Sequence, residues 1–165
     1  MVSTADTMND YDDKMVEAFV NKPEVTQWYK YTFSRYSVNG VEKMAWAWSW
    51  WAFFGGIFYL LYRKAYMAAL GLFVLTSVSL AIPFGGLIVW ILTGGLAPYF
   101  VYKVYRSKKA EIESTITDEQ QRIETIRAVG GYNNWAILLA VAFHAFMWIW
   151  IFFAFSTMMA MLSQQ

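Results

Sequence analysis

The charged residues of this 165-residue chain are confined to certain stretches, and this distribution constrains the fold more than any other feature. Three segments carry no Asp, Glu, Lys or Arg at all, namely residues 44–62, 65–102 and 128–165. Ionised groups are expensive to place in hydrocarbon, so long segments without them are typical of membrane proteins. Composition agrees, because 58% of residues are hydrophobic and only 15% are charged, against roughly a quarter in soluble domains. The sequence therefore predicts an all-α integral membrane protein.

The charge balance and the cysteine content exclude several classes of protein. A net charge of +1 leaves no basic excess to follow the phosphates of a nucleic acid, so nucleic-acid binding is not expected. The absence of cysteine excludes disulfides and thiolate metal or redox sites. The first residues are acidic and polar, so they are not expected to form a cleavable signal peptide.

Composition divides the chain into four consecutive regions. They are a cytoplasmic acidic tail with aromatic helices, a Trp-rich interfacial helix with a transmembrane hairpin, a stretch of charged cytoplasmic helices, and a C-terminal transmembrane helix. These regions comprise residues 1–43, 44–104, 105–132 and 133–165, respectively.

The N-terminal region is expected to begin with a disordered tail, residues 1–10, and to continue as two short helices. The first helix carries Phe19 on its apolar face, and the second carries Trp28 and Phe33 before a turn at Asn39-Gly40. Helices this short have little core of their own in which to bury aromatic rings. These three aromatic residues are therefore predicted to dock a cytoplasmic or membrane-bound partner protein.

Residues 44–62 are long enough to cross a bilayer, but basic residues flank them on both sides. Lys43 precedes the segment and Arg63 follows it, and basic residues gather on the cytoplasmic side of membranes. Indole rings prefer the headgroup level, so an interfacial or re-entrant helix is favoured over a true span. The residues expected at this interface are Trp46, Trp48, Trp50 and Trp51.

Residues 65–102 are too long for one crossing, because a helix of 38 residues would extend about 57 Å against a hydrocarbon core of about 30 Å. Pro83 and the glycines after it favour two crossings, roughly 65–82 and 86–104, joined by an outer turn. Both basic ends of this hairpin then lie on the cytoplasmic side. Three residues are expected to interrupt the second crossing, namely Gly94, Gly95 and Pro98.

Two further groups of residues are predicted to lie at the cytoplasmic interface. A basic pair flanked by tyrosines is suited to anionic lipid headgroups, although any cytoplasmic helix end has a similar composition. A second group, of tyrosines in steps of three, ends the hairpin. The two groups are Tyr62, Arg63, Lys64 and Tyr66, and Tyr99, Tyr102 and Tyr105.

Residues 103–129 are polar and helical in pattern, with isoleucines at helical spacing between the charges. Ile116 and Ile123 are therefore added to the predicted docking surface for a partner. Thr117–Gln120 has the pattern of a capping box that starts a helix, and Gly130-Gly131 is expected to end it.

The last crossing is expected from Trp135 to Leu162, which gives about three spans with the N-terminus in the cytoplasm and the C-terminus in the periplasm. It contains the only histidine, His144, on one face with Ala136 and Ala140. One hypothesis is that His144 binds haem or a metal, or acts as a proton-linked switch. The simpler interpretation, which we favour, is a polar side chain that bonds to a neighbouring helix.

Residues 50–66, WWAFFGGIFYLLYRKAY, resemble the Trp/Phe-rich run ending in Tyr-Arg-Lys of DUF2628, a family of small bacterial membrane proteins. Residues 94–109 resemble the Gly- and Tyr-rich exit of that family, and residues 130–133 resemble a turn before the last span of some relatives. The likeness covers roughly residues 24–135. The chain departs from the family at residues 95–97, where relatives often have Gly-Asn, and it lacks the cysteines of the zinc ribbon that some relatives carry. The resemblance implies the membrane architecture and no activity.

No arrangement of residues predicts an enzyme, since the chain has neither a nucleophile–base pair, a phosphate loop nor metal-ligand spacing. No cofactor is expected, unless the haem hypothesis for His144 holds. We expect a non-enzymatic accessory or scaffold subunit of a bacterial inner-membrane complex, in contact with membrane lipids and a larger membrane or cytoplasmic complex. The main alternative is a small homo-oligomeric channel or transporter, because unwound backbone in membranes lines water-filled paths. This alternative rests on the helix breaks at Pro83 and Pro98 and on the glycine pairs Gly55-Gly56, Gly85-Gly86 and Gly94-Gly95.

Overall fold

The computed structural model of the protein describes residues 4–38 and 41–162, and the turn predicted at Asn39-Gly40 lies outside them. The described residues are mostly helical, with one antiparallel pair of two-residue strands. In chain order the elements are α1 (Thr4–Val20), α2 (Pro23–Ser34), β1 (Ser37–Val38), β2 (Val41–Glu42), α3 (Trp50–Gly55), α4 (Ile57–Tyr62), α5 (Tyr66–Ser79), α6 (Gly85–Thr115), α7 (Glu119–Val129) and α8 (Asn134–Leu162).

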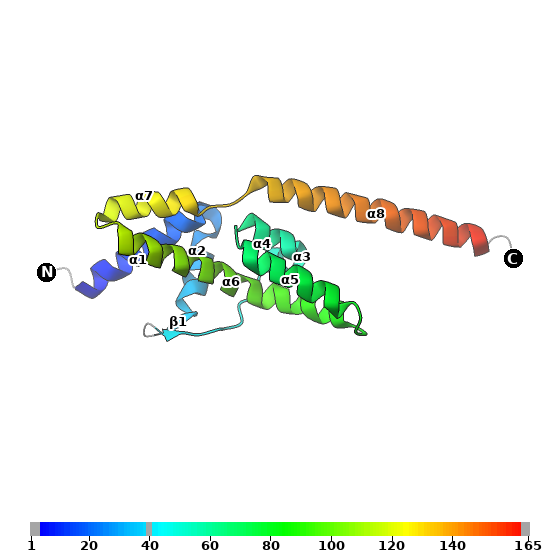
Figure 1. Ribbon diagram of the computed structural model, residues 1–165, viewed down its shortest axis with the longest axis horizontal. Helices are drawn as coiled ribbons and strands as arrows, with labels where there is room; N and C mark the ends of the chain where they lie inside the picture. The colour runs from blue at the N-terminus through cyan, green and yellow to red at the C-terminus, as the bar shows by residue number, and fades with distance from the viewer. Residues whose placement is uncertain (1–3, 39–40, 163–165) are drawn as a thin grey trace.

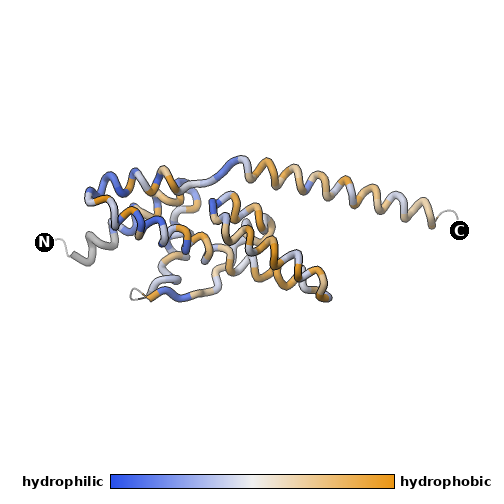
Figure 2. The backbone as a smooth tube through the Cα atoms, in the orientation of Figure 1, coloured by the Kyte–Doolittle hydropathy of each residue, from blue (hydrophilic) through white to orange (hydrophobic). Residues whose placement is uncertain are grey.

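These elements form two halves that differ in polarity (Figures 1 and 2). One half, which we call the polar body, contains α1, α2, α7 and the C-terminal part of α6. The apolar half contains α3, α4, α5, the N-terminal part of α6, and α8, which all lie to the same side of the polar body. Among the described residues, α6 and the segment Glu119–Leu162 that includes α8 are long and apolar enough to cross a membrane, whereas α5 is apolar but has only 14 residues. The structure thus confirms an all-α chain with candidate membrane helices.

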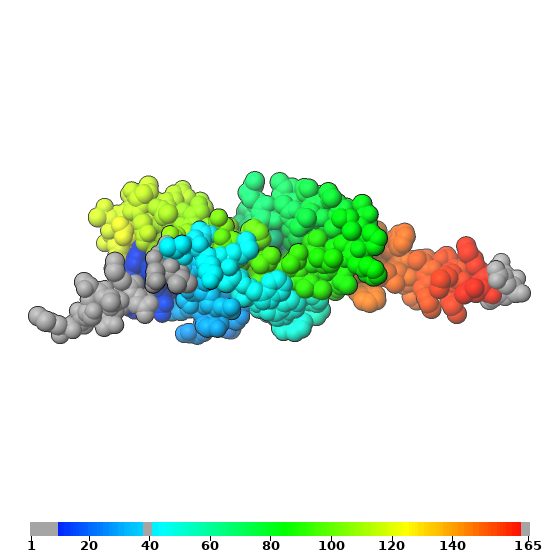
Figure 3. Space-filling view, turned by 90° about the horizontal axis from the view of Figure 1, so that it is seen from below, coloured from blue at the N-terminus to red at the C-terminus, as the bar shows by residue number. Residues whose placement is uncertain are grey.

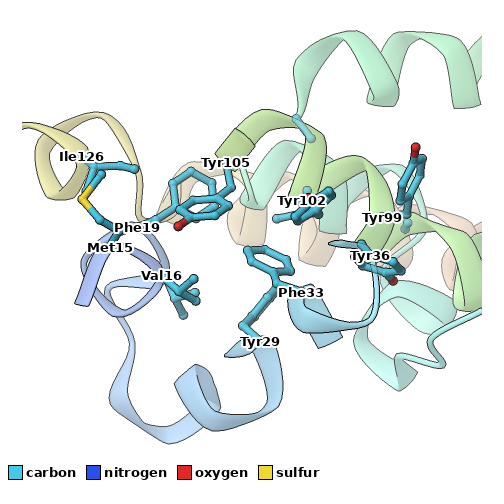
Figure 4. Close-up of a cluster of buried hydrophobic side chains, with 14 of the residues drawn as sticks. Met15, Val16, Phe19, Tyr29, Phe33, Tyr36, Tyr99, Tyr102, Tyr105 and Ile126 are labelled. Atoms are coloured by element: carbon cyan, nitrogen blue, oxygen red, sulfur yellow. The ribbon is translucent and has the colours of Figure 1, made fainter. Parts of the chain in front are cut away.

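The polar body has a core made mainly of aromatic rings (Figure 4). Phe33 of α2 stacks on Tyr105 of α6 with ring centroids 5.3 Å apart, and Phe19 of α1 lies 5.2 Å from the same ring. Ile126 of α7 is fully buried against this cluster. Burial raises the pKa of the Tyr105 phenol, so the ring stays neutral inside the core. A small helical bundle therefore buries its aromatic surface without a partner.

This core corrects the prediction of a docking surface. Phe19, Phe33 and Ile123 are buried within the polar body and are not exposed to a partner. Ile116 is half-buried against the same core, and Trp28 is half-buried on α2. Short helices can bury these side chains because α1, α2 and α7 pack on one another and on α6. Each helix considered alone gives no sign of this arrangement.

The N-terminal segment is helical from Thr4 onward, where the sequence predicts a disordered tail. Ion pairs between helices hold α1 in place. Lys109 of α6 pairs with Asp12, and Lys30 of α2 lies 3.5 Å from the carboxylate of Glu17. These contacts and the packing of α1 on α7 order a segment whose local composition is that of a solvated tail.

The Trp-rich segment 44–62 is not the single interfacial helix that the sequence predicts. Residues 44–49, which we call the tryptophan strap, are extended, and the chain becomes helical only at Trp50. The strap lies along α6, since the backbone N–H of Ala47 donates to the carbonyl of Gly95 at 3.0 Å. After the strap, α3 and α4 are separated by Gly56, whose φ of 51° breaks the helix.

Helix α6 continues through Gly94, Gly95 and Pro98, which the sequence predicts to interrupt it. Because Pro98 has no N–H, the Gly94 carbonyl loses its helical donor, and the backbone N–H of Ser49 donates to it instead at 2.8 Å. A Cβ atom at Gly94 would lie 2.9 Å from the ring of Trp48, and one at Gly95 would overlap the ring of Trp46. The two glycines therefore provide the flat face on which the strap lies.

Residues 130–133 connect the polar body to α8. The backbone N–H of Gly131 donates to the Phe19 carbonyl at 2.7 Å, and that of Asn133 donates to the Tyr62 carbonyl at 2.9 Å. The position of Gly130 has no room for a side chain, because a Cβ there would lie 2.6 Å from the carbonyl oxygen of Phe19. The start of α8 is thus attached to both halves of the molecule.

Helix α8 then leaves the rest of the chain and projects alone (Figures 1 and 3). Its first part packs on α4, where the rings of Phe58 and Phe143 are 5.4 Å apart. Beyond His144, every described residue of α8 is exposed. A long apolar helix is therefore solvent-exposed over most of its described length.

Candidate functional site

A groove with a volume of about 770 Å³ lies where the two halves meet, and we call it the boundary groove. Its walls come from α2, the end of the tryptophan strap, α3, α4 and the first part of α8. Apolar and aromatic side chains form most of its lining, with a few polar groups among them. Ligand-binding pockets usually have this composition.

Lys22 and Arg63 form the basic end of the boundary groove. Arg63 is only 4% exposed, and its Nη1 donates to the carbonyl of Val20 at 3.1 Å. Val20 ends α1, and the negative end of a helix dipole favours a cation there. The guanidinium carbon of Arg63 lies 4.5 Å from the ring centroid of Tyr29, but its buried Nε has no hydrogen-bond partner among the described residues.

Among the described residues, no carboxylate lines the groove, and neither of its two cations forms an ion pair. Tyr29 supplies no negative charge, because burial raises the pKa of its phenol, whose oxygen is hydrogen-bonded to that of Tyr59 at 2.9 Å. By contrast, Lys30, Lys103 and Lys109 all have carboxylate partners in or near the polar body. The basic end of the groove therefore carries uncompensated positive charge.

Aromatic rings and one face of α8 form the apolar part of the groove. Trp50, Trp51 and Phe54 lie at its rim and are largely exposed. The α8 face runs from Ala136 to His144, a rise of about 12 Å at 1.5 Å per residue. The groove is thus an elongated apolar channel with a basic end.

His144 lies at the other end of this α8 face and lines the groove. Its Nδ1 is 2.6 Å from the carbonyl oxygen of Ala140, and since a carbonyl only accepts, this contact places the proton on Nδ1. The centroid of the imidazole lies 6.1 Å from that of Phe58 on α4. The side chain therefore sits at a helix–helix contact with Nε2 as its remaining acceptor, and haem ligation at this atom stays a hypothesis.

The residues predicted to bind lipid headgroups are divided between two roles. Arg63 lines the groove, whereas Lys64 donates to the carbonyl of Gly130. The hydroxyl of Tyr66 accepts a hydrogen bond from the side chain of Asn133. Lys64 and Tyr66 thus secure the connection to α8, and only the arginine of the basic pair faces the groove.

The tyrosines predicted to form an interface belt are mostly internal. Tyr99, Tyr102 and Tyr105 are buried, because residues from α2 onward cover this side of α6. Tyr36, for example, packs on the first two of these rings at centroid distances of 5.3 and 5.4 Å. Tyr62 lines the groove and stacks on Tyr132 at 5.2 Å.

The glycine pairs behind the channel hypothesis have packing and backbone roles. Trp46 and Trp48 cover Gly94 and Gly95, and the first turn of α6 packs Gly85 against the backbone of Ser79. Gly56 supplies the break between α3 and α4. These contacts, in the residues described, remove the specific reason for placing a solute path at the glycines.

Sequence reasoning missed Lys22 as a site residue. It lies in the corner between α1 and α2, after Asn21 with a φ of 47° and before Pro23. Nothing in this local pattern indicates that the corner packs beside α4 and α8. The only available signal was a basic residue at the edge of a charged region, which many surface positions share.

A family model described as a protein of unknown function (DUF2628) matches residues 8–106 of the chain, which is more than half of it. The match includes most of α1, all of α2 to α5 and the N-terminal part of α6. Every groove residue outside α8 lies within the matched range, whereas α7 and α8 follow it. Comparisons with curated proteins and with solved structures give no significant match.

Proposed function

We propose that this chain, which belongs to the DUF2628 family of proteins of unknown function, is a non-enzymatic accessory or scaffold subunit of a complex in the bacterial inner membrane. In this proposal α5, the N-terminal part of α6, and α8 cross the bilayer. The polar body lies in the cytoplasm and the C-terminus in the periplasm, while the tryptophan strap, α3 and α4 lie at the cytoplasmic interface. The observation that carries the proposal is the exposed middle of α8.

Trp148 and Trp150 lie near the middle of the 29-residue helix α8 and are 66% and 67% exposed. Tryptophan in membrane proteins favours the two interfaces, where its N–H can reach water or headgroups. In the hydrocarbon core the same N–H is costly unless protein supplies an acceptor. Two indoles at the centre of a spanning helix are therefore better accommodated by a neighbouring protein helix than by lipid tails.

The proposed orientation is supported by the charges at the boundary. Lys22, Arg63 and Lys64 lie where the polar body meets the apolar half, as cytoplasmic residues do under the positive-inside rule. The far end of the α5–α6 hairpin exposes Leu80, Ile82 and other apolar side chains, which suits insertion toward the opposite leaflet.

Native purification tests the accessory role. We expect the chain, extracted from its own membranes in mild detergent, to elute with a larger membrane protein in fixed stoichiometry by mass spectrometry. Replacing both Trp148 and Trp150 with alanine should reduce the recovered partner by more than tenfold, since central aromatic anchors contribute about 2 kcal/mol or more to an interface and about 1.4 kcal/mol is tenfold. Trp135→Ala, at the start of the same helix, is the matched control. Recovery of a lone monomer would contradict the proposal, and a lone homo-oligomer would favour the channel.

The three-span topology has a separate test, because the chain has no cysteine of its own. A single cysteine at Ile82→Cys should react with a membrane-impermeant maleimide added outside intact spheroplasts. Ser114→Cys, on the exposed C-terminal part of α6, should react only after the membrane is opened. If Ile82→Cys reacts from neither side, the hairpin turns back inside the bilayer and the chain does not have three spans.

A further inference from the structure

We propose that the boundary groove binds one anionic phospholipid of the cytoplasmic leaflet, with its phosphate between Lys22 and Arg63 and an acyl chain along α8 toward His144. The proposal rests on the membrane placement given above but not on the accessory role. It assigns a ligand to the boundary groove and does not depend on the exposed middle of α8, on which the accessory role rests.

The positive charge of the basic end favours a ligand that carries a negative charge. Lys22 and Arg63 both lie against the ring of Tyr62, with their cationic groups 6.0 and 5.4 Å from its centroid. Both cationic groups therefore belong to the same end of the groove. Since no described carboxylate lines the groove, the ligand itself must supply the negative charge that pairs with them.

The buried Nε of Arg63 indicates that the arginine is incompletely satisfied by its own chain. The Nη1 of the guanidinium donates to the Val20 carbonyl, and the group lies against the ring of Tyr29. Its Nε has no acceptor among the described residues. An unsatisfied donor on a buried charged group costs more than one on a neutral group. A phosphate oxygen, which accepts from guanidinium groups with favourable geometry, would satisfy it.

The shape of the groove favours a lipid over a free anion. Inorganic phosphate would need only the basic end, whereas the groove continues as an apolar channel of about 12 Å along α8. Phe54 and Phe58 line that continuation and provide no hydrogen-bond partner for a polar ligand. Trp50 and Trp51 at the open rim are suited to the headgroup level, which is also where a lipid would enter from the bilayer.

Quenching of tryptophan fluorescence tests the site, because bromine on an acyl chain quenches indoles that it contacts. The full-length protein is placed in phosphatidylcholine vesicles that contain a fixed fraction of either brominated phosphatidylglycerol or brominated phosphatidylcholine. Lipid that merely surrounds the protein quenches equally with both headgroups. We expect the association constant for the anionic lipid to exceed that for phosphatidylcholine by about 25-fold, since each of the two cations contributes roughly fivefold.

Matched substitutions separate the groove from the rest of the surface. Lys22→Glu should lower the preference for phosphatidylglycerol by about fivefold or more, whereas Lys43→Ala, which removes a cation outside the groove, should leave it unchanged. Ala140→Phe fills the apolar channel and should remove the preference, whereas Ala142→Phe on the opposite side of α8 should not. Lys22 makes only weak contacts with the rings of Tyr62 and Tyr132, so its substitution leaves the fold intact.

Three outcomes would overturn the proposal. Equal quenching by the two brominated lipids in the unmodified protein would show that no anionic lipid is selected. A preference that survives both Lys22→Glu and Ala140→Phe would place the lipid elsewhere on the protein. Loss of the preference on addition of inorganic phosphate alone would make the groove an anion site rather than a lipid site. None of these results depends on whether a partner protein co-purifies, so this test and that of the accessory role fail independently.

Discussion

The polar body and the apolar half of this protein find partners for their side chains in different ways. In the polar body, aromatic rings from α1, α2 and α6 pack on one another, and lysines pair with carboxylates on other elements. In the apolar half, α8 leaves its large side chains exposed, and the nearby Arg63 and Lys64 donate to backbone carbonyls rather than to carboxylates. The first region is complete as a folded unit, whereas the second leaves surface that its environment must cover.

This difference separates two meanings of a hydrophobic residue in one chain. A ring such as Phe33 stabilises the fold because it is removed from water by the chain itself. A ring such as Phe152 is largely exposed, so it contributes to the fold only through whatever covers α8. Substitutions of the same chemical kind in the two regions should therefore have very different effects, and this contrast can be tested.

The largest expected effect is that of Phe33→Ala. Removing this ring from the aromatic core should lower the free energy of unfolding by about 3–5 kcal/mol, as is usual for buried phenylalanine. Near-ultraviolet circular dichroism during thermal or urea unfolding in mild detergent would measure the loss, because the core consists of aromatic rings. Phe152→Ala on α8 is the control and should change stability by no more than about 0.5 kcal/mol. Equal losses would mean that α8 is covered in the purified protein.

An intermediate effect is expected at the face of α6 that receives the tryptophan strap. Gly95→Leu should displace Trp46 and cost about 1–3 kcal/mol, the usual range for overpacking. It should also make residues 44–49 accessible to limited proteolysis, since the strap would no longer pack on the glycine face of α6. Gly71→Leu on α5 introduces the same side chain at a position with nothing within 4 Å, and should be tolerated. A strap that stays protected in Gly95→Leu would contradict this account of the glycines.

The smallest expected effect concerns the ion pairs of the polar body. Burial opposes the charge of Lys109, but its hydrogen bond to Asp12 and the nearby Glu113 outweigh this and raise its pKa above the ordinary value. A pKa raised by folding stabilises the folded state below the unfolded-state value of about 10.4, and this stability is lost as the pH rises through the folded value. Lys109→Met should therefore cost about 1 kcal/mol or less at neutral pH and low salt, and nothing measurable above the folded pKa.

Chemical denaturation at two pH values would measure the effect of Lys109→Met, with Lys108→Met as the control. Lys108 pairs with Glu111 one turn away on the same exposed helix surface, so its loss should have less effect on how α1 is held. An effect of Lys109→Met that does not change with pH or salt would mean that its alkyl chain, rather than its charge, stabilises the body.

Local patterns in the sequence predict the helical segments well where a single feature decides them. The charge-free runs correspond to α3–α5, the start of α6, and α8. The helix predicted after Thr117 begins one residue later, with the Asp118 side chain accepting from the N–H of Gln121 at 2.8 Å, and it ends at Gly130 as predicted. Capping and charge exclusion act over a few residues, so they can be read from the sequence alone.

The extended strap was less visible because two patterns compete in the same residues. The run from Trp46 to Trp50 alternates large and small side chains, which is typical of an extended segment, but its length and apolarity favour a helix. The extended conformation depends on the hydrogen bond from Ser49 to the Gly94 carbonyl, which Pro98 leaves free. Gly94 is far from the strap in the sequence.

The candidate groove was predictable only in part. Arg63 and His144 could be singled out because a basic residue at a membrane boundary and a lone histidine in an apolar helix are both unusual. Their assembly into one groove with Lys22 could not, because it depends on how α2, α4 and α8 meet. The burial of Phe19 and Phe33 was missed for the same reason, since it requires the packing of helices from both ends of the chain.

The hydrogen bond from Ser49 to Gly94 also sets an order of events during synthesis. The strap leaves the ribosome about 45 residues before its acceptor, which at about 5–20 residues per second is a delay of roughly 2–9 s. During that interval Trp46 and Trp48 have no glycine face on which to lie, and under the proposed placement their rings would rest at the bilayer surface. In the proposed membrane arrangement, docking of the strap is therefore a late step of assembly that follows synthesis of the glycine face on α6.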